Sequence, residues 1–472
     1  MGVSTVHHTI EIDEIIERKR DLYINISEKI WNFAEMSYEE KESAELLCKS
    51  LEEQGFEVER GVAGIDTAFI GSYGSGGPVV AILGEFDALA GLSQEKGVAE
   101  YRPLSKNGSG HGCGHNLLGT GAFAAAVAVK EYMQENGLSG TVRYYGCPAE
   151  ESGDGKTYMV REGLFDDVDF ALTWHPMSVN AVSYMNALAT YQVYFRFKGR
   201  ASHAATSPHL GRSALDAVEL MNVGVNYLRE HIIDDARIHY AITNTGGFSP
   251  NVVQAEAEVL YLIRAPKVGE VENIYQRVHK IAQGAALMTE TELEIEFDSG
   301  TSDLIRNTTL DKVMLENFQK LGVPEFTEGE INFAEKIQAT LTEEELADLW
   351  DDSLRGKALT DVILPLQGEE KAFGSTDVAD VSWVTPTAQV HTTCIANGTS
   401  LHTWQVVSQV GTSIGHKGML HAGKVIAATA VEMMQNEDLI QQAKKDLQAK
   451  LGGKRYVSPI PSDVVPPINR KN

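Results

Sequence analysis

Short apolar segments of strand type alternate with helical segments through the first part of this chain. Residues 77–91 ("GPVVAILGEFDALAG"), 140–151 ("GTVRYYGCPAEE") and 168–176 ("VDFALTWHP") are each typical of a buried strand. An alanine-rich segment at 117–137 predicts a helix that ends at Gly137. Strands that alternate with helices indicate a mostly parallel sheet with helices on both faces. The chain is therefore expected to have an α/β fold.

The alternation changes near residue 189. From there to residue 301 the pattern is strand, helix, two strands, helix and strand, which is the order of a ferredoxin-like split unit. A chain of 472 residues is too long for one ordinary hydrophobic core. We therefore expect two domains, a larger one formed by residues 1–188 and 302–472 and a smaller one at 189–301 inserted into it.

Other segments have simpler patterns. Residues 11–56 are expected to be helical, and so is a segment from about 415 to 450. A strand is expected at 388–398. The charge-rich segment at 324–372 is interpreted as a helical insertion on the surface.

The composition excludes several classes of partner. Acidic residues outnumber basic ones 66 to 40, and a formal net charge of −26 argues against nucleic acid or an anionic membrane as partner. The sequence has no run of 18 or more apolar residues, so no membrane span is predicted. The first 20 residues lack the pattern of a signal peptide. Four cysteines do not make a disulfide framework. Cytoplasmic residence is therefore the expectation.

Polar side chains follow the predicted strands where each strand ends. Asp87 follows the first, Glu150 and Glu151 the second, His175 the third, and His402 the strand near residue 397. In open α/β sheets, ligands bind at this edge. Cys113 and His115 precede the helix at 117–136 on a glycine-rich loop, "GHGCGH". The residues that we expect to converge on one crevice as metal ligands are Cys113, His115, Glu151, His175 and His402.

Thiolate, imidazole and carboxylate together suit zinc or another first-row divalent ion. Burial of the adjacent pair Glu150 and Glu151 would be costly without a cation. We expect neighbouring residues on an extended segment to point opposite ways, so that one binds metal while the other faces the substrate as a base. Two alternatives remain open. Cys113 could be a nucleophile with His115 as its base, and a single histidine after a strand could be an ordinary packing or surface residue.

Several motifs resemble one known family. "HGCGHN", "PAEESGDGK", "TWHP", "GRASHAA" and the inserted split unit are similar to the M20 metallopeptidase and amidohydrolase family, in its subgroup with Cys-x-His. The resemblance covers nearly the whole chain. It implies a catalytic domain that binds two divalent metal ions, zinc or manganese, and a smaller domain that serves as lid and dimerisation domain.

The resemblance also implies individual roles. Cys113 would bridge the two metals, with His115, Glu151, His175 and His402 as the other ligands, and Asp87 would orient a ligand. Glu150 would be the general base and acid, and His203 would stabilise the oxyanion, often across a dimer interface. Asn251 and Arg264 would hold the substrate's carbonyl or carboxylate. Glu85 stands where other branches have a histidine ligand and receives no role; His111, His416 and His421 receive none, although His416 competes with His402.

The implied activity is metal-dependent hydrolysis of the amide bond of N-acyl or N-aroyl amino acids. The nearest substrate is p-aminobenzoyl-glutamate, for which Arg200, Arg212 and Arg264 are candidate cationic contacts. A dipeptidase or an N-acyl-amino-acid deacylase of the same fold is the alternative, and a non-catalytic metal-binding dimerisation protein is the alternative of another class. The expected partners are a second copy of the chain or a related subunit.

Overall fold

The computed structural model describes residues 4–183, 186–366 and 374–468. The chain has an α/β fold with two sheets, as predicted. The strands of the larger sheet are β1 (Glu57–Arg60), β2 (Phe69–Ser75), β3 (Val79–Glu85), β4 (Gly140–Cys147), β5 (Phe170–Met177), β6 (Ala181–Val182) and β11 (Thr387–Thr393). Their order is β1-β2-β4-β3-β5-β11-β6, and the four central strands run parallel. The carboxyl ends of β3, β4 and β5 therefore meet at one edge, where the expected site residues follow them.

Helices cover both faces of this sheet, and its central strands are buried at almost every position. On β3, Val80 and Ile82 face a core shared with α4 (His115–Asn136) and α13 (Ser413–Met434). Ala81 and Leu83 face the opposite core, which includes α5 (Gly155–Arg161) and α11 (Val378–Val384). Parallel strands buried on both sides lose the polar alternation of a half-exposed sheet. The remaining helices of this part are α1 (Ser4–Arg18), α2 (Arg20–Phe33), α3 (Lys41–Glu53), α8 (Thr308–Leu321), α9 (Glu328–Gln338), α10 (Glu343–Ala347), α12 (Trp404–Val410) and α14 (Glu437–Leu451).

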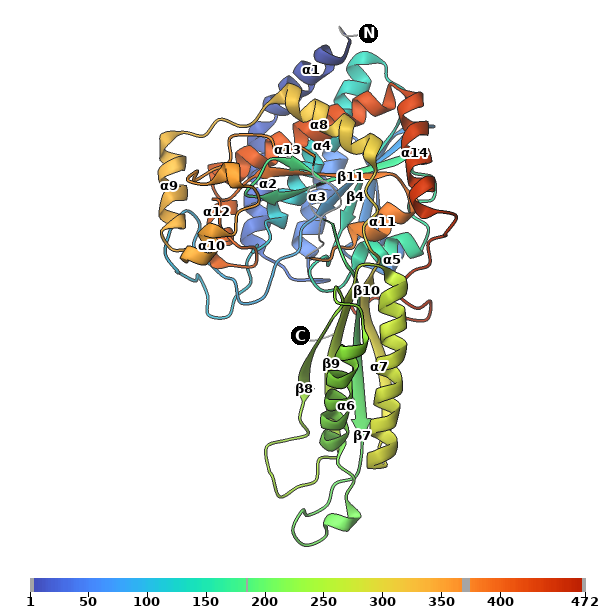
Figure 1. Cartoon of the computed structure of the whole chain (residues 1–472). Coiled ribbons are helices and arrows are strands. Elements are labelled where there is room, and N and C mark those ends of the chain that lie inside the picture. Colours follow the sequence, from blue (N-terminus) through green and yellow to red (C-terminus); the bar gives the residue numbers. More distant parts are fainter. Residues whose placement is uncertain (1–3, 184–185, 367–373, 469–472) are drawn as a thin grey trace.

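The segment from residue 189 to 301 forms the second sheet. Its strands are β7 (Ala189–Lys198), β8 (Arg237–Asn244), β9 (Glu256–Ala265) and β10 (Glu292–Thr301), in the antiparallel order β10-β7-β9-β8. The helices α6 (Ala214–Leu228) and α7 (Val268–Thr289) pack on one face and share a core with it. Figure 1 shows this unit projecting from the larger part of the molecule, with the loop after β7 at its far end.

Several predicted boundaries differ from the observed ones. The helical stretch at 11–56 is three helices, because Lys19 leaves the helical conformation and Ala34 adopts a left-handed one, φ +46°. The helix expected at 415–450 is two, because Asn436 caps a new helix by accepting a hydrogen bond from Leu439 N–H. The segment at 324–372 contains the short helices α9 and α10, while residues 367–373 lie outside the described part. No helix of the described residues is both long and apolar enough to cross a membrane.

Candidate metal centre

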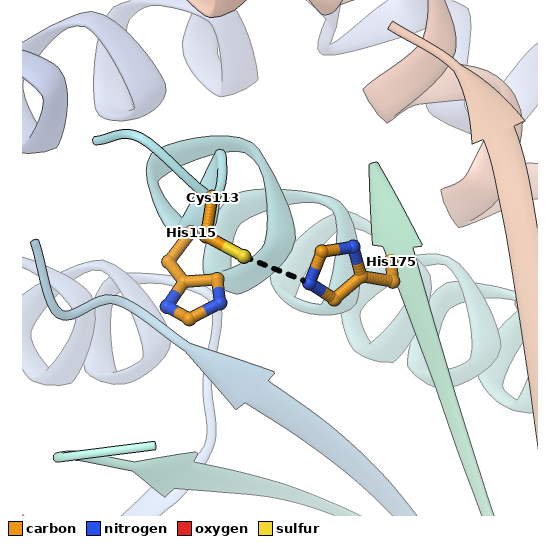
Figure 2. A group of neighbouring side chains, drawn as sticks. All are labelled: Cys113, His115 and His175. Atoms are coloured by element: carbon orange, nitrogen blue, oxygen red, sulfur yellow. Dashed lines mark hydrogen bonds between the residues drawn. The ribbon is translucent and has the colours of Figure 1, made fainter. Parts of the chain in front are cut away.

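Cys113, His115 and His175 meet at the carboxyl edge of the larger sheet. Cys113 lies in the loop before α4, His115 is the first residue of α4, and His175 is on β5. Figure 2 shows the sulfur of Cys113 pointing toward the His175 ring, and Sγ lies 3.4 Å from Nε2. One ligand atom from each residue lies within 4.8 Å of the others. The helix begins two residues earlier than predicted, so the position of His115 is fixed by helical backbone.

In both His115 and His175, Nδ1 is the ring nitrogen that faces away from the cluster, and it makes a hydrogen bond. His115 Nδ1 donates to Asp87 Oδ1 at 2.8 Å, and His175 Nδ1 donates to the Pro176 carbonyl oxygen at 2.9 Å. These bonds leave the lone pair of Nε2 on each ring facing the cluster. A carboxylate or carbonyl behind a histidine is the usual arrangement at metal sites, because it fixes the tautomer and the ring orientation. The expected role of Asp87 matches this contact.

Glu150 and Glu151 lie in a turn after β4 and not on an extended segment, so the expectation that they point opposite ways is wrong. Glu150 Oε2 and Glu151 Oε1 each lie 3.9 Å from His115 Nε2. The turn follows Ala149, whose φ of +60° is in the left-handed region that a non-glycine residue rarely adopts. Such strained backbone is common beside functional sites. Both carboxylates therefore approach the same point.

His402 completes the cluster, and its competitor His416 does not take part. His402 Nε2 lies 3.2 Å from Glu151 Oε2. The backbone N–H of His402 donates to the Gly112 carbonyl oxygen at 2.8 Å. Its φ of +62° is again left-handed. His416 is buried in α13, and burial lowers its pKa to about 4. His111 is buried too and contacts the Ile30 carbonyl oxygen at 3.0 Å, which is a packing role.

Two glycines of the loop lie in closely packed surroundings. A Cβ on Gly112 would lie 2.3 Å from a methyl carbon of Leu92 and 3.3 Å from the Cα of His402. A Cβ on Gly114, whose φ is +78°, would lie 2.7 Å from the Pro176 ring. The glycines thus let the loop lie against the segments that carry His402 and His175.

The site is rich in buried negative charge. Burial, with the nearby carboxylates of Glu85 and Glu151, raises the pKa of Glu150 well above its usual range. Burial and Glu151 likewise raise the pKa of the Cys113 thiol. A cysteine nucleophile is usually found where surrounding positive charge lowers the thiol pKa, so this environment does not favour that alternative. A bound cation would stabilise both the thiolate and the carboxylates.

Two buried atoms at the centre lack hydrogen-bond partners within the described part of the chain. They are His115 Nε2 and Glu151 Oε1. Leaving such groups unpaired in the interior is costly. Both residues belong to groups that each bring three possible ligand atoms within 4.8 Å of one another: Cys113, His115 and His175 in one, and Cys113, Glu151 and His402 in the other. The donor set therefore fits divalent metal ions.

Glu85, which was expected to have no role, and Lys156, which the sequence motifs did not distinguish, both lie at the cluster. Glu85 Oε2 lies 3.3 Å from His115 Nε2, and Glu85 forms a third cluster with His115 and Glu150. Lys156 Nζ lies 2.6 Å from Glu85 Oε1 and 2.6 Å from Asp377 Oδ1, and its side chain is fully buried. The motif "GDGK" carries this lysine, but nothing in the sequence pattern distinguishes it from a surface lysine.

The structure does not bring the three expected substrate contacts to the cluster of the same chain. His203 and Asn251 lie near each other, since Ala204 N–H donates to the Asn251 carbonyl oxygen at 2.9 Å. Their loops are at the far end of the smaller sheet (Figure 1), about 30 Å along β7 from its start at 3.3 Å per residue. Arg264 is at the opposite end of β9, in a hollow that none of the cluster side chains lines.

Residues 81–462 match peptidase family M20/M25/M40. The chain belongs to this family. One relative, a subunit of p-aminobenzoyl-glutamate hydrolase from Escherichia coli (strain K12), is 51% identical over 96% of this chain and 98% of its own length. The other subunit type of that hydrolase, from the same organism, is 30% identical over 48% of this chain and 52% of its own length. The chain is thus a hydrolase of the M20 family.

A solved M20 structure confirms the fold. The Bacillus subtilis protein described as a dinuclear metal binding peptidase from the M20 family superposes with a TM-score of 0.57 at 16% identity. The match covers 89% of this chain and 99% of that one. The overall arrangement of helices and strands is therefore shared with that M20 structure.

Proposed function

We propose that this chain hydrolyses the amide bond of N-acyl or N-aroyl amino acids, with aroyl-glutamates such as p-aminobenzoyl-glutamate as the favoured substrates. The main support is the 51% identity, over nearly the full length of both chains, to the p-aminobenzoyl-glutamate hydrolase subunit from E. coli. The convergence of thiol, imidazole and carboxylate side chains at the sheet edge supports the same class of chemistry.

The proposed ligands of two divalent metal ions are Cys113, His115, Glu151, His175 and His402, with zinc or manganese as the favoured metals. Bound there, the ions would polarise the amide carbonyl and acidify a water molecule. Asp87 keeps His115 in the tautomer that presents Nε2, as its hydrogen bond to Nδ1 indicates. The Pro176 carbonyl oxygen does the same for His175.

Glu150 is the proposed general base and acid. Its carboxylate is largely buried, and Oε2 lies 3.9 Å from Nε2 of the proposed ligand His115, so that the group is close to a metal-bound water. In the proposed reaction Glu150 takes a proton from the attacking water and then gives it to the amine nitrogen that leaves.

We also propose that residues 189–301 act as a lid and dimerisation domain on a catalytic domain of residues 1–188 and 302–472. The loops of His203 and Asn251 lie far from the cluster of their own chain, which supports their use in the site of a second chain. That second chain is another copy or a related subunit, since the E. coli hydrolase has two related subunit types. Arg264, near the end of β9, remains the proposed contact for the substrate's carbonyl or carboxylate. Cytoplasmic residence remains a prediction, and the four cysteines are free in the structure.

The experiment that tests the proposed function is a hydrolysis assay on a small substrate panel. p-Aminobenzoyl-glutamate, an N-acetyl amino acid, a dipeptide and an aroyl ester would each be incubated with the metal-loaded protein. We expect p-aminobenzoyl-glutamate to have the highest kcat/KM and a chelator to abolish its hydrolysis.

Three results would contradict parts of this proposal. Preference for the dipeptide would move the chain to the dipeptidase alternative. Hydrolysis that continues at full rate in chelator would restore the cysteine nucleophile. No hydrolysis of any amide by fully metal-loaded protein, alone or with the related subunit, would favour the non-catalytic alternative.

A further inference from the structure

One buried lysine links the candidate metal centre to helix α11. Lys156 Nζ lies 2.6 Å from Glu85 Oε1 and 2.6 Å from Asp377 Oδ1, and all three side chains are buried. The other oxygen of Glu85, Oε2, lies 3.3 Å from Nε2 of the proposed ligand His115. Asp377 directly precedes α11, and it also accepts the backbone N–H of Lys156 at 2.8 Å. One ammonium group therefore lies between a carboxylate at the metal centre and the start of α11.

Helix α11 in turn holds the connection that follows β10. Asp380 accepts two hydrogen bonds from Ser302, one from the backbone N–H at 3.1 Å and one from the hydroxyl at 2.7 Å. Ser382 Oγ accepts the backbone N–H of Ile305 at 2.9 Å. Ser302, Asp380 and Ser382 are fully or almost fully buried, so water competes little for these bonds. Figure 1 shows α11 close to the end of β10, where the smaller sheet joins the larger part.

The connection that precedes β7 is held from the same place. Leu188 N–H donates to the Gly374 carbonyl oxygen at 2.8 Å, and Gly374 lies three residues before Asp377. Leu304 N–H donates to the Ala187 carbonyl oxygen at 3.3 Å, which joins the two connections to each other. Both connections of the smaller sheet are thus anchored to α11 or to the segment directly before it.

Glu85 and Asp377 attract the same ammonium group from opposite sides. Cations bound at the metal centre would attract the Glu85 carboxylate, because an oxygen of Glu85 lies within 4.8 Å of ligand atoms of His115 and Glu150. The attraction of Glu85 for Lys156 would then fall, since buried charges interact strongly and are little screened. Asp377 would hold more of the ammonium, and the start of α11 would be fixed more firmly.

We propose that Lys156 and α11 couple metal binding to the position of the smaller domain, so that an occupied metal centre fixes the two connections of the β7–β10 sheet. Lys156 is a positioning residue in this proposal, because it acts through Asp377. A coupling of this kind is reciprocal, so fixing the connections also strengthens metal binding. The inference rests on the proposed metal centre and not on the identity of the substrate.

Hydrogen exchange, followed by mass spectrometry, tests the coupling. The metal-free chain is compared with the chain loaded with Zn²⁺, and elemental analysis gives the metal content of each sample. The peptides that report on the connection and on α11 cover residues 302–305 and 374–384. Peptides from α14, which lies outside the path, report on general stabilisation.

The test variant is Ser302→Ala/Ser382→Ala, because Lys156→Met also removes a buried charge that the fold requires. The two serine substitutions remove both hydroxyl contacts between α11 and the connection, and they leave every proposed ligand unchanged. The matched control is Ser93→Ala/Ser408→Ala. It also removes two buried hydroxyls with hydrogen bonds, at positions away from both connections.

We expect Zn²⁺ to slow exchange at residues 302–305 and 374–384 of the parent chain by about fivefold or more, the lower end of the usual coupling between two sites. The control variant should keep this effect. In Ser302→Ala/Ser382→Ala the effect at 302–305 should fall to within about twofold, while the variant still binds Zn²⁺.

Four results would overturn the proposal. Unchanged exchange at both segments in Zn²⁺-loaded parent chain would show that there is no coupling. An equal metal effect in the two double variants would show that the coupling does not pass through α11. Equal slowing in α14 would reflect general stabilisation. A chain that binds no Zn²⁺ would overturn the proposed metal centre as well, whereas the first three results leave it intact.

Discussion

Asp87 accepts the Nδ1 hydrogen bond of His115 at 2.8 Å, and both side chains are fully buried. The second carboxylate oxygen of Asp87 accepts the backbone N–H of Glu151 at 2.9 Å. One aspartate thus fixes the orientation of a proposed ligand on α4 and of the turn after β4. This carboxylate therefore holds together the start of α4 and the turn after β4, which are distant in the sequence.

The substitution Asp87→Asn should weaken metal binding about 10–100-fold, the usual effect of losing a carboxylate behind a ligating histidine. The amide keeps one acceptor but presents an N–H₂ group to the other donor, so either His115 or Glu151 loses its anchor. Competition with a chromogenic chelator measures the affinity. Asp167→Asn, at an exposed ion pair with Arg143, is the control. Equal affinity in the two variants would show that Asp87 does not orient a ligand.

His402 and His416 provide a matched pair of substitutions. His402→Ala should lower the bound metal more than Asp87→Asn does, because it removes a proposed ligand beside Glu151. His416→Ala should keep the metal content of the parent chain, since its ring lies in α13 outside the clusters. Elemental analysis after gel filtration measures both. Loss of metal in His416→Ala alone would exchange the two assignments.

Lys156→Met should strongly destabilise the fold, by about 3–5 kcal/mol, because Glu85 and Asp377 would lose the cation between them while buried. Lys198→Met breaks an exposed pair with Glu294 and should change stability little. Urea unfolding of the two variants measures the difference. Similar stabilities of Lys156→Met and the parent chain would mean that the two carboxyl groups stay neutral in the fold.

Acid should destabilise the chain partly through His421. Burial lowers the pKa of its ring to about 4, from a usual value of 6.5, and its Nε2 contacts the Gly322 carbonyl oxygen at 2.7 Å. Between these values the unfolded chain binds the proton and the folded chain does not. Stability is therefore lost as the pH falls from 6.5 to about 4, by about 3 kcal/mol. His421→Gln should show a shallower acid slope in thermal unfolding than the exposed-site control His209→Gln, and equal slopes would contradict the assignment.

The sequence predicts the larger sheet and the edge of the site well, for a physical reason. Strands buried on both faces are mostly apolar, so polar residues such as Glu85 and Asp87 mark where β3 ends. Parallel strands then bring those ends together without further information. The split unit was predicted from a different pattern, because buried and less buried residues alternate along strands such as β7.

Contacts that depend on turns and packing could not be predicted in this way. The left-handed conformation of Ala149 places Glu150 and Glu151 toward one atom of His115, and no residue type at 149 signals it. The burial of Lys156 depends on Asp377, which is 221 residues away in the sequence. The choice between His402 and His416 depends on the hydrogen bond from His402 N–H to Gly112.

The most direct test of the account is the metal content and turnover of Glu150→Gln. If Glu150 carries the proton in amide hydrolysis, this variant should bind as much metal as the parent chain. Its kcat for p-aminobenzoyl-glutamate should fall by at least about 10²–10⁴-fold, the usual contribution of a general base. Full metal content with near-normal kcat would contradict the central claim.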